Sequence, residues 1–203
     1  MFLYEHEGGA YLNVTNRCPV ACAFCVKTDW GRQFRGSDLD LKGREPSLED
    51  VLIALNERLH RSPPPKEFVF CGFGEPTFRL DVIEAVGRWA RESGRKIPVR
   101  LNTVGLGNLI HSRDIVPDLA RGVDAVSVSL NTGDPEQWMV IHRPAPAYRA
   151  GGFAAAREFA RLCAVGGLRT RVTAVERSDV DLGPLRAYAA SIGAEFLARP
   201  ALG

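Results

Sequence analysis

The chain has 203 residues, 45% of them hydrophobic and 25% charged, with a formal net charge of +2 at pH 7, so we expect one domain over residues 1–203. A near-neutral charge, without basic stripes between aromatic residues, does not indicate a nucleic-acid partner. The sequence has no run of about 18 apolar residues, which a membrane-spanning helix would need. Its first residues, MFLYEHEGG, lack the pattern of a signal peptide, so we expect a cytoplasmic protein without a membrane partner.

Short apolar strands alternate with helical patterns along the chain. In chain order, strands are predicted at 10–14, 67–71, 99–102, 124–131, 169–176 and 194–199. The helical patterns between them lie at 48–59, 79–93, 114–120, 151–167 and 182–193. Ser47 is a candidate N-cap for the first helix, and Gly94 is expected to end the second. The long irregular stretch at 27–46, with Trp30, Arg32, Phe34 and Arg35, is expected to be either a solvated loop with one or two aromatic anchors or a lid that shields a site or holds substrate.

About six β/α units in succession predict a parallel sheet with right-handed crossovers. Six units are too few to close an eight-stranded barrel, which leaves an open, partial (β/α)6 TIM-like barrel or a doubly wound sheet. In either α/β fold, chemistry takes place beyond the C-terminal ends of the strands. The motifs that stand there are the cysteine loop at 18–25, CGFGEP at 71–76, NTVG at 102–105 and SLN at 129–131, followed by HRP at 142–144.

Three of the five cysteines form the pattern Cys18-x-x-x-Cys22-x-x-Cys25. Thiols stay reduced in the cytoplasm, so clustered cysteines there indicate a metal or catalytic site before a disulfide. A structural zinc site uses four ligands, often from two C-x-x-C pairs, and this pattern offers one pair and one further cysteine. In a [4Fe–4S] cluster, three cysteines leave one iron open to a substrate or cofactor. The pattern therefore favours such a cluster, with a zinc site or a redox pair as alternatives.

This spacing, with Phe24 just before the third cysteine, resembles the signature of the radical S-adenosylmethionine (SAM) enzymes. The resemblance covers nearly the whole chain and implies a partial (β/α)6 barrel, a [4Fe–4S] cluster on Cys18, Cys22 and Cys25, and SAM on the open iron. It implies an oxidoreductase in which one electron, from a donor such as a flavodoxin or ferredoxin, cleaves SAM into methionine and a 5′-deoxyadenosyl radical. That radical typically abstracts a hydrogen atom from the substrate, whose class (small molecule, peptide or protein) stays open.

The same resemblance assigns further residues to SAM binding. GFGEP resembles the Gly-Gly-Glu motif of the family, with Phe73 in place of the first glycine. Gly74 would permit close approach of the backbone to the ligand, and Glu75 would accept hydrogen bonds from the methionyl ammonium. Arg143 is a candidate partner for the methionyl carboxylate, with a surface ion pair as its alternative. Positions that match the neighbourhood of SAM in the family are Phe24, Asn102, Thr103, Ser129, Asn131 and the segment 172–175.

Each of these assignments has a structural alternative. Glu75 would also be favoured as an acid at a helix N-terminus, and the polar residues after the strands would also serve as caps. Cys163 shares a helix face with apolar residues and is expected in the core. For Cys71, the alternatives are burial in the second strand and a thiol that faces the substrate.

Several stretches together are most similar to the radical SAM proteins associated with TatD-type nucleases. They are YLNVTNRCPVACAFC, WGRQFRG, REPS, FVFCGFGEP, VRLNTVG, IVPDL, DAVSVSLN and HRP. This similarity sharpens the fold and the cofactors but leaves the reaction open. The alternatives are an activating enzyme of the glycyl-radical type, which acts on a protein partner, and a non-catalytic, metal-stabilised binding module. Six β/α units are too many for a thioredoxin-like protein.

Overall fold

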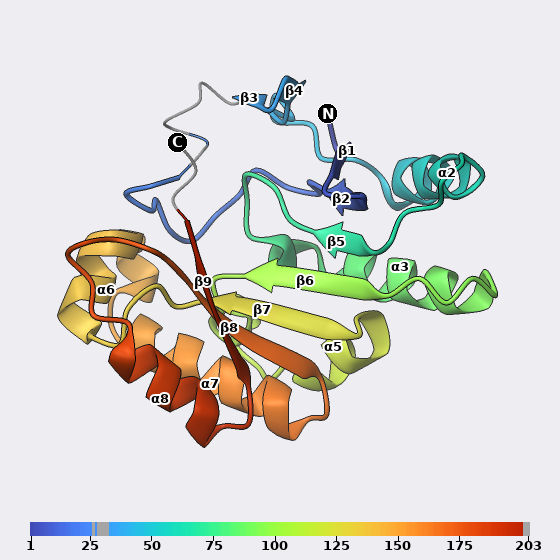
Figure 1. Cartoon of the computed structure of the whole chain (residues 1–203). Helices are drawn as coiled ribbons and strands as arrows, with labels where there is room; N and C mark the ends of the chain where they lie inside the picture. The colour runs from blue at the N-terminus through green and yellow to red at the C-terminus, as the bar shows by residue number, and fades with distance from the viewer. Residues whose placement is uncertain (26, 28–32, 201–203) are drawn as a thin grey trace.

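The computed structural model describes residues 1–25, 27 and 33–200. Within these residues, the main sheet has seven strands in the order β1-β2-β5-β6-β7-β8-β9 (Figure 1). The strands are β1 (Leu3–His6), β2 (Gly9–Leu12), β5 (Phe68–Phe70), β6 (Val99–Thr103), β7 (Ala125–Ser129), β8 (Arg169–Val175) and β9 (Glu195–Arg199). β1 pairs antiparallel with β2, and every later pair of neighbours is parallel. The predicted α/β fold, an open barrel of parallel strands, is thereby confirmed.

The sequence did not predict β1, which forms a hairpin with β2. Residues Glu7 and Gly8 make the two-residue turn, and both have left-handed backbones, with φ of 50° and 82°. Such a turn matches the right-handed twist of the flanking strands. In the sequence, the glycine pair Gly8-Gly9 is the feature that indicates this hairpin turn.

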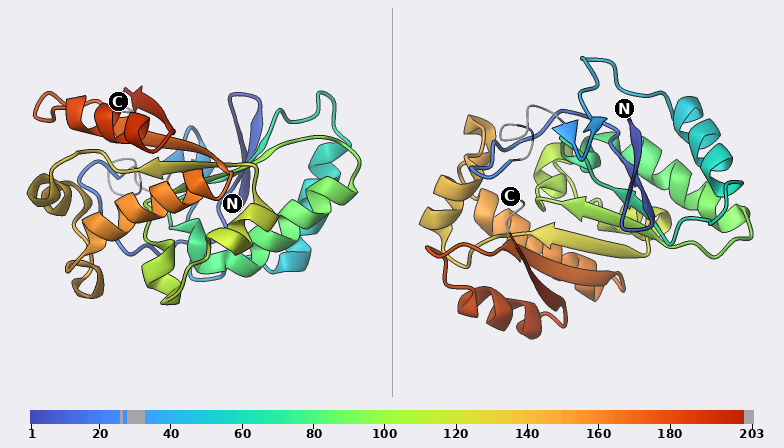
Figure 2. Two further views of the ribbon diagram at one scale, coloured as in Figure 1. Left: turned by 90° about the horizontal axis from the view of Figure 1, so that it is seen from below. Right: turned by 45° about the horizontal axis from the view of Figure 1, so that its top comes forward.

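The connections between parallel strands carry helices along one face of the sheet (Figure 2). The five predicted helices are α2 (Leu48–Leu59), α3 (Leu80–Glu92), α5 (Val116–Gly122), α7 (Gly152–Val165) and α8 (Gly183–Ser191). The sequence missed the short α4 (Gly107–His111), α6 (Pro135–His142) and the 3-10 turns η1 (Pro76–Arg79) and η2 (Pro146–Tyr148). Ser47 caps α2 in a capping box with Asp50, and α3 ends just before Gly94, whose φ is 70°.

The main core lies between the sheet and these helices, and Cys163 is fully buried in it, as expected. Among the helices that the structure describes, none combines the length and the apolar character needed to cross a bilayer.

A second, smaller apolar cluster lies on the inner face of the sheet. It consists of Tyr4, Tyr11, Phe34, Leu39, Val69 and Phe73. Phe34 and Leu39 come from the long stretch at 27–46, in which β3 (Gln33–Phe34) and β4 (Ser37–Asp38) form a short antiparallel hairpin. This stretch therefore packs onto the inner face through these two side chains, which both a loop with aromatic anchors and a lid would do. Trp30 and Arg32, which belong to the same stretch, lie outside the described residues.

Candidate functional site

The three cysteines lie on the loop after β2, and the backbone of this loop is bound to the chain at the end of α6. The N–H of Ala21 donates to the carbonyl of His142 at 3.0 Å, and the N–H of Ala23 donates to the carbonyl of Ile141 at 2.8 Å. Val20 also forms an isolated β-bridge with Pro144. The HRP motif, far away in the sequence, is therefore brought directly to the cysteine loop.

The three thiols differ in exposure. Cys18 is exposed, whereas Cys22 and Cys25 are half-buried. The N–H of Cys25 donates to the carbonyl of Cys22 at 3.1 Å, which closes a tight turn between them. Burial raises the pKa of the Cys22 thiol to about 12, and the neighbouring thiols of Cys18 and Cys25 add to this rise. The free thiol is thus protonated near neutral pH, and a metal would have to displace its proton.

His142 is the direct neighbour of Cys22. Its Nδ1 lies 3.6 Å from the Cys22 Sγ, and its ring stacks on Trp138 with a centroid distance of 4.8 Å. On the other side, Nε2 lies 3.1 Å from Asn131 Nδ2 and 3.2 Å from the carbonyl oxygen of Leu130. His142 is fully buried, and this burial lowers its pKa to about 4, so the imidazole is neutral at pH 7.

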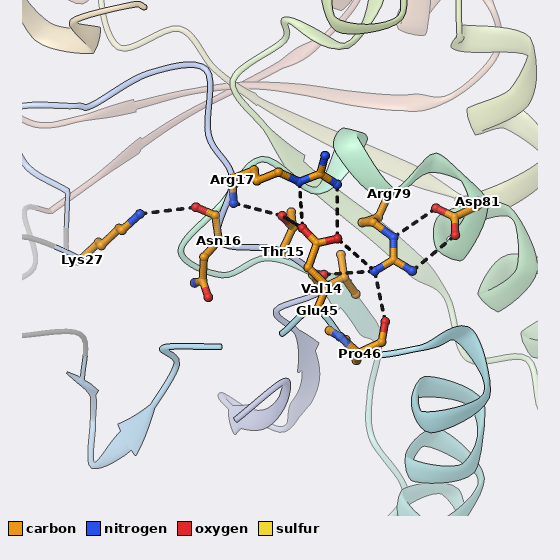
Figure 3. A network of polar contacts seen from close by, with 9 residues as sticks. All are labelled: Val14, Thr15, Asn16, Arg17, Lys27, Glu45, Pro46, Arg79 and Asp81. Carbon is orange, nitrogen blue, oxygen red and sulfur yellow. Dashed lines mark hydrogen bonds and ion pairs between the residues drawn. The ribbon is translucent and has the colours of Figure 1, made fainter. Parts of the chain in front are cut away.

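Glu45, from the long stretch before α2, joins the start of the cysteine loop to η1 (Figure 3). Its carboxylate accepts hydrogen bonds from Thr15 Oγ1 at 2.5 Å and from Arg17 Nε at 2.8 Å. Arg79 Nη1 lies 3.5 Å from the same carboxylate and donates to the carbonyl of Pro46 at 3.1 Å. Partial burial acts to raise the pKa of Glu45, but these donors and charges together hold it below its usual range.

The GFGEP loop packs against the same segment of chain. A Cβ on Gly74 would stand 2.3 Å from the carbonyl oxygen of Thr15 and 2.6 Å from that of Arg17, so only glycine fits. The close approach at Gly74 is therefore to the protein's own backbone. The N–H of Glu75 also donates to the Arg17 carbonyl, at 2.8 Å, which fixes the two loops together.

The carboxylate of Glu75 is 1% exposed and is held by donors within the protein. Oε1 accepts from the backbone N–H and the hydroxyl of Thr77 and from the hydroxyl of Thr103, at 3.1, 2.8 and 2.8 Å. Oε2 accepts from the N–H of Val104 at 2.8 Å. Burial raises the pKa of Glu75, and these hydrogen bonds oppose the rise. Glu75 is also the N-cap of η1. Its side chain therefore has the position at a helix N-terminus that was given above as the alternative to SAM binding.

A cavity of about 1040 Å³ extends along the inner face of the sheet. Five of the residues predicted for the site line it, and they are Cys22, Phe24, Cys25, Asn102 and Val175 of the segment 172–175. Cys71 also lines this cavity and is half-buried, so its position agrees with the alternative of a thiol that faces the substrate.

The other predicted residues lie around this cavity without lining it. The hydroxyls of Ser129 and Thr173 are 3.2 Å apart, and Asn131 accepts from the N–H of Val175 at 3.0 Å through Oδ1. Arg143 is exposed at the C-cap of α6, close enough to Cys22 for its charge to lower the pKa of that thiol. The structure thus gathers the predicted residues at one rim, but it gives most of their polar atoms partners within the protein.

The chemistry of the cysteine loop fits an iron–sulfur cluster. Its donors are three thiols on one loop, and two of them face the cavity. In the part of the chain that the structure describes, no group of three His, Cys, Asp or Glu side chains is placed to hold a single metal ion. The ligands of a cluster bind different irons, so their sulfur atoms do not need to converge on one point.

Sequence reasoning missed the charged residues that line the cavity. Arg100 Nη2 lies 2.6 Å from Glu67 Oε1, and Arg171 Nη2 lies 2.8 Å from Glu195 Oε2. Arg199 lines the same cavity. A signal was present, because charged residues alternate with apolar ones in strands of a parallel sheet, whose two faces are normally both apolar. Such alternation indicates a polar interior on one face.

A family model described as the radical SAM superfamily matches residues 12–175. The GTP 3',8-cyclase of Corynebacterium glutamicum (strain R) is 28% identical over 193 residues, which is 91% of this chain and 46% of the relative. The 7,8-dihydro-6-hydroxymethylpterin dimethyltransferase of Methanocaldococcus jannaschii is 34% identical over 97 residues, which is 48% of this chain and 17% of the relative. This chain therefore spans less than half the length of these curated relatives.

Among solved structures, Streptococcus suis SuiB bound to its precursor peptide SuiA superimposes with a TM-score of 0.68 at 17% identity, over 93% of this chain and 38% of SuiB. SuiB bound to S-adenosylmethionine gives a TM-score of 0.67 at 16% identity, over 95% of this chain and 40% of SuiB. At these identities the likeness concerns the fold.

Proposed function

The chain belongs to the radical SAM superfamily, and on that premise we propose that it is an enzyme that reductively cleaves SAM at a [4Fe–4S] cluster and acts on a substrate in its barrel. One observation carries the proposal: two thiols of the Cys18-Cys22-Cys25 loop, and Phe24 between them, line the cavity of about 1040 Å³. Because the chain spans only part of its relatives, the full activity and the substrate belong to the proposal.

In this proposal, the three cysteines bind three irons of the cluster. When bound together, the cluster and SAM supply a 5′-deoxyadenosyl radical that abstracts a hydrogen atom from the substrate. The protein's part is to hold the cysteine loop still, through its backbone bonds to Ile141 and His142 and through the contacts of Glu45. The cavity places the substrate on the side of the loop that Cys22 and Cys25 face.

We propose two kinds of role for the other residues near SAM. Phe24, Asn102 and Arg143 have exposed or cavity-facing side chains, which makes them candidates for direct contact with SAM. Other residues have side chains that already form hydrogen bonds within the protein, or, in the case of Gly74, have no side chain. We propose that these residues support the residues that contact SAM; they are Gly74, Glu75, Thr103, Ser129 and Asn131.

Finer assignments rest on the sequence alone. We propose that the chain falls in the group of radical SAM proteins associated with TatD-type nucleases, that residues 1–203 form one core unit, and that it works in the reducing cytoplasm. Its electron donor is proposed to be a flavodoxin or a ferredoxin. The substrate class is open between small molecules, to which the names of the two curated relatives refer, and peptides such as the one bound by SuiB.

The test is release of 5′-deoxyadenosine from SAM by the anaerobically reconstituted protein after reduction with dithionite. The wild-type chain should release it, and Cys22→Ala should release none, because one iron loses its thiolate. Cys163→Ala is the matched control, since this cysteine is buried in the core between the sheet and the helices. Circular dichroism should report the same fold for both variants. A Cys22→Ala protein that still formed the product would rule out the assignment of this cysteine.

A further inference from the structure

The cavity is lined by several guanidinium groups, and those of Arg100 on β6 and Arg171 on β8 have carboxylate partners. Arg100 donates to both oxygens of Glu67, at 2.9 and 2.6 Å, in a bidentate pair. It also donates to Asn102 Oδ1 at 2.6 Å and to the Tyr11 hydroxyl at 3.4 Å. Four of the five N–H donors of Arg100 are therefore used, and one at Nη1 has no acceptor among the described residues.

Among the described residues, neither Arg169, the first residue of β8, nor Arg199, the last residue of β9, has such a partner. Arg199 stands at the C-terminal end of its strand, the end at which the cysteine loop follows β2. It lines the same cavity, and no described residue forms a hydrogen bond or an ion pair with its guanidinium. Its backbone is nevertheless well fixed, because β9 pairs in register with β8 and the carbonyl of Arg199 accepts from the N–H of Glu176 at 2.7 Å. The guanidinium is thus presented to the cavity from a rigid strand and not from a loop.

Arg199 and Arg100 influence one another across the curved sheet, although two strands separate β9 from β6. Arg199 is exposed at the edge of the sheet, but the part of it that faces the cavity is shielded from water. This shielding lowers its pKa, the Cys71 side chain in its ionised form opposes the change, and the positive charge of Arg100 lowers the pKa further. Two like charges thus face one space, and Glu67 neutralises only Arg100. An anion bound between them would relieve this repulsion and would use the free donors of both groups.

We propose that Arg199, assisted by Arg100, binds an anionic group of the substrate, either a carboxylate or a phosphate, inside the barrel. The inference rests on the proposed function and adds the substrate class. SAM also carries a carboxylate, but Arg143 is the guanidinium beside the cysteine loop, whereas Arg199 neighbours Cys71 and Arg100. We therefore assign Arg199 to the substrate and Arg143 to SAM.

The test uses two probes, inorganic pyrophosphate for a phosphate and succinate for a carboxylate, in calorimetric titrations of the reconstituted full chain. The wild-type protein should bind at least one of them saturably. Arg199→Gln should weaken that binding about tenfold or more, since a charge-assisted pair is lost. Arg199→Lys, which keeps the charge but loses the planar fork, should bind with intermediate affinity. The control is Arg177→Gln, because Arg177 pairs with Asp179 outside the cavity.

Three results would overturn the inference. In the first, the wild-type chain would bind neither probe. In the second, Arg199→Gln would bind both probes as tightly as the wild type does, and in the third it would lose affinity for SAM but keep its affinity for the probes. The last result would assign Arg199 to the carboxylate of SAM. Release of 5′-deoxyadenosine, measured in the same preparations, separates the two proposals. SAM cleavage without probe binding rejects only the anion site, whereas probe binding without SAM cleavage rejects the radical SAM activity.

Discussion

His142 has the hydrogen-bond partners that a neighbour of a metal-bound thiolate needs. Asn131 is oriented by the N–H of Val175, which donates to Oδ1, so its Nδ2 faces His142 Nε2. The carbonyl oxygen of Leu130, which can only accept, lies 3.2 Å from the same Nε2, so the two neighbours of Nε2 favour opposite tautomers of the neutral ring. A thiolate is also only an acceptor, so a metal-bound Cys22 would favour the proton on Nδ1, which lies 3.6 Å from Sγ, and His142 would then donate to this sulfur.

His142→Phe keeps a ring on Trp138 but removes the N–H. Hydrogen bonds to sulfur stabilise the reduced, more negative cluster, so the midpoint potential of the reconstituted protein should fall in this variant. Its free energy of unfolding should also fall by about 1–3 kcal/mol, because Asn131 Nδ2 loses a buried acceptor. A redox titration monitored by electron paramagnetic resonance measures the potential. The exposed His60, changed to Phe, is the control and should leave the potential unchanged. Equal potentials for His142→Phe and the wild type would remove this role.

At the scale of elements, the contacts of Glu45 hold three segments together. The first is the chain just before Cys18, the second is the end of the long stretch before α2, and the third is η1 (Figure 3). The position of the cysteine loop therefore depends on a carboxylate at position 45, which belongs to the REPS stretch and not to the motifs at the ends of the strands.

The contribution of Glu45 to stability should depend on pH. Its pKa is lower in the folded chain than in the unfolded one, so the stabilisation is fully present above the unfolded value of about 4.3 and is lost as pH falls through the folded value. Thermal unfolding of the wild type and Glu45→Gln should therefore differ equally at pH 7 and pH 5, and less at pH 3. Glu57→Gln, an exposed change on α2, should show no such dependence. A difference between the wild type and Glu45→Gln that stays constant down to pH 3 would contradict this account.

The elements themselves were largely predictable, for physical reasons. Strands buried on the helical side and helices with one apolar face leave clear periodic patterns, so the six parallel strands and four helices of nine or more residues agree with prediction. Helices of eight residues or fewer have too few turns for a clear pattern, and of these α5 was predicted whereas α4 and α6 were not. Contacts such as that of His142 with Cys22, which joins positions 120 residues apart, depend on tertiary packing and leave no local signal.

At the scale of the whole molecule, the barrel is open, and the stretch with β3 and β4 covers part of its inner face. Phe34 is 9% exposed and packs edge-on against Tyr4 and His6, at centroid distances of 5.7 and 5.3 Å. Phe34 lines the same cavity as Cys22 and Cys25. We therefore expect this side chain to limit the access of water and oxygen to the thiols.

Phe34→Ala should open this route. In air, the absorbance of the reconstituted cluster should decay severalfold faster in this variant than in the wild type. The free energy of unfolding should fall by less than the ~3–5 kcal/mol that is typical when a buried phenylalanine is replaced by alanine. Phe196→Ala is the matched control, because Phe196 packs on the helical side with Arg186 above its ring. Equal decay rates for the two variants would show that Phe34 does not shield the site.

The site was predictable to a different degree from the fold. The spacing of the cysteines and their place after a strand are local properties, so the loop itself was found. The internal partners of Glu75 depend on tertiary packing, which sequence periodicity does not encode. The charged lining of the cavity did leave a signal, the alternation of charged and apolar residues in the strands, but that pattern does not show which of these side chains, Arg199 among them, stays without a partner.

The most direct test of the account is the electron paramagnetic resonance spectrum of the reduced, reconstituted chain before and after SAM is added. A cluster held by Cys18, Cys22 and Cys25 has one iron free of protein ligands, so the account predicts a [4Fe–4S] signal that shifts when SAM binds. A signal that SAM leaves unchanged, or a purified chain that holds stoichiometric zinc and takes up no iron, would contradict it.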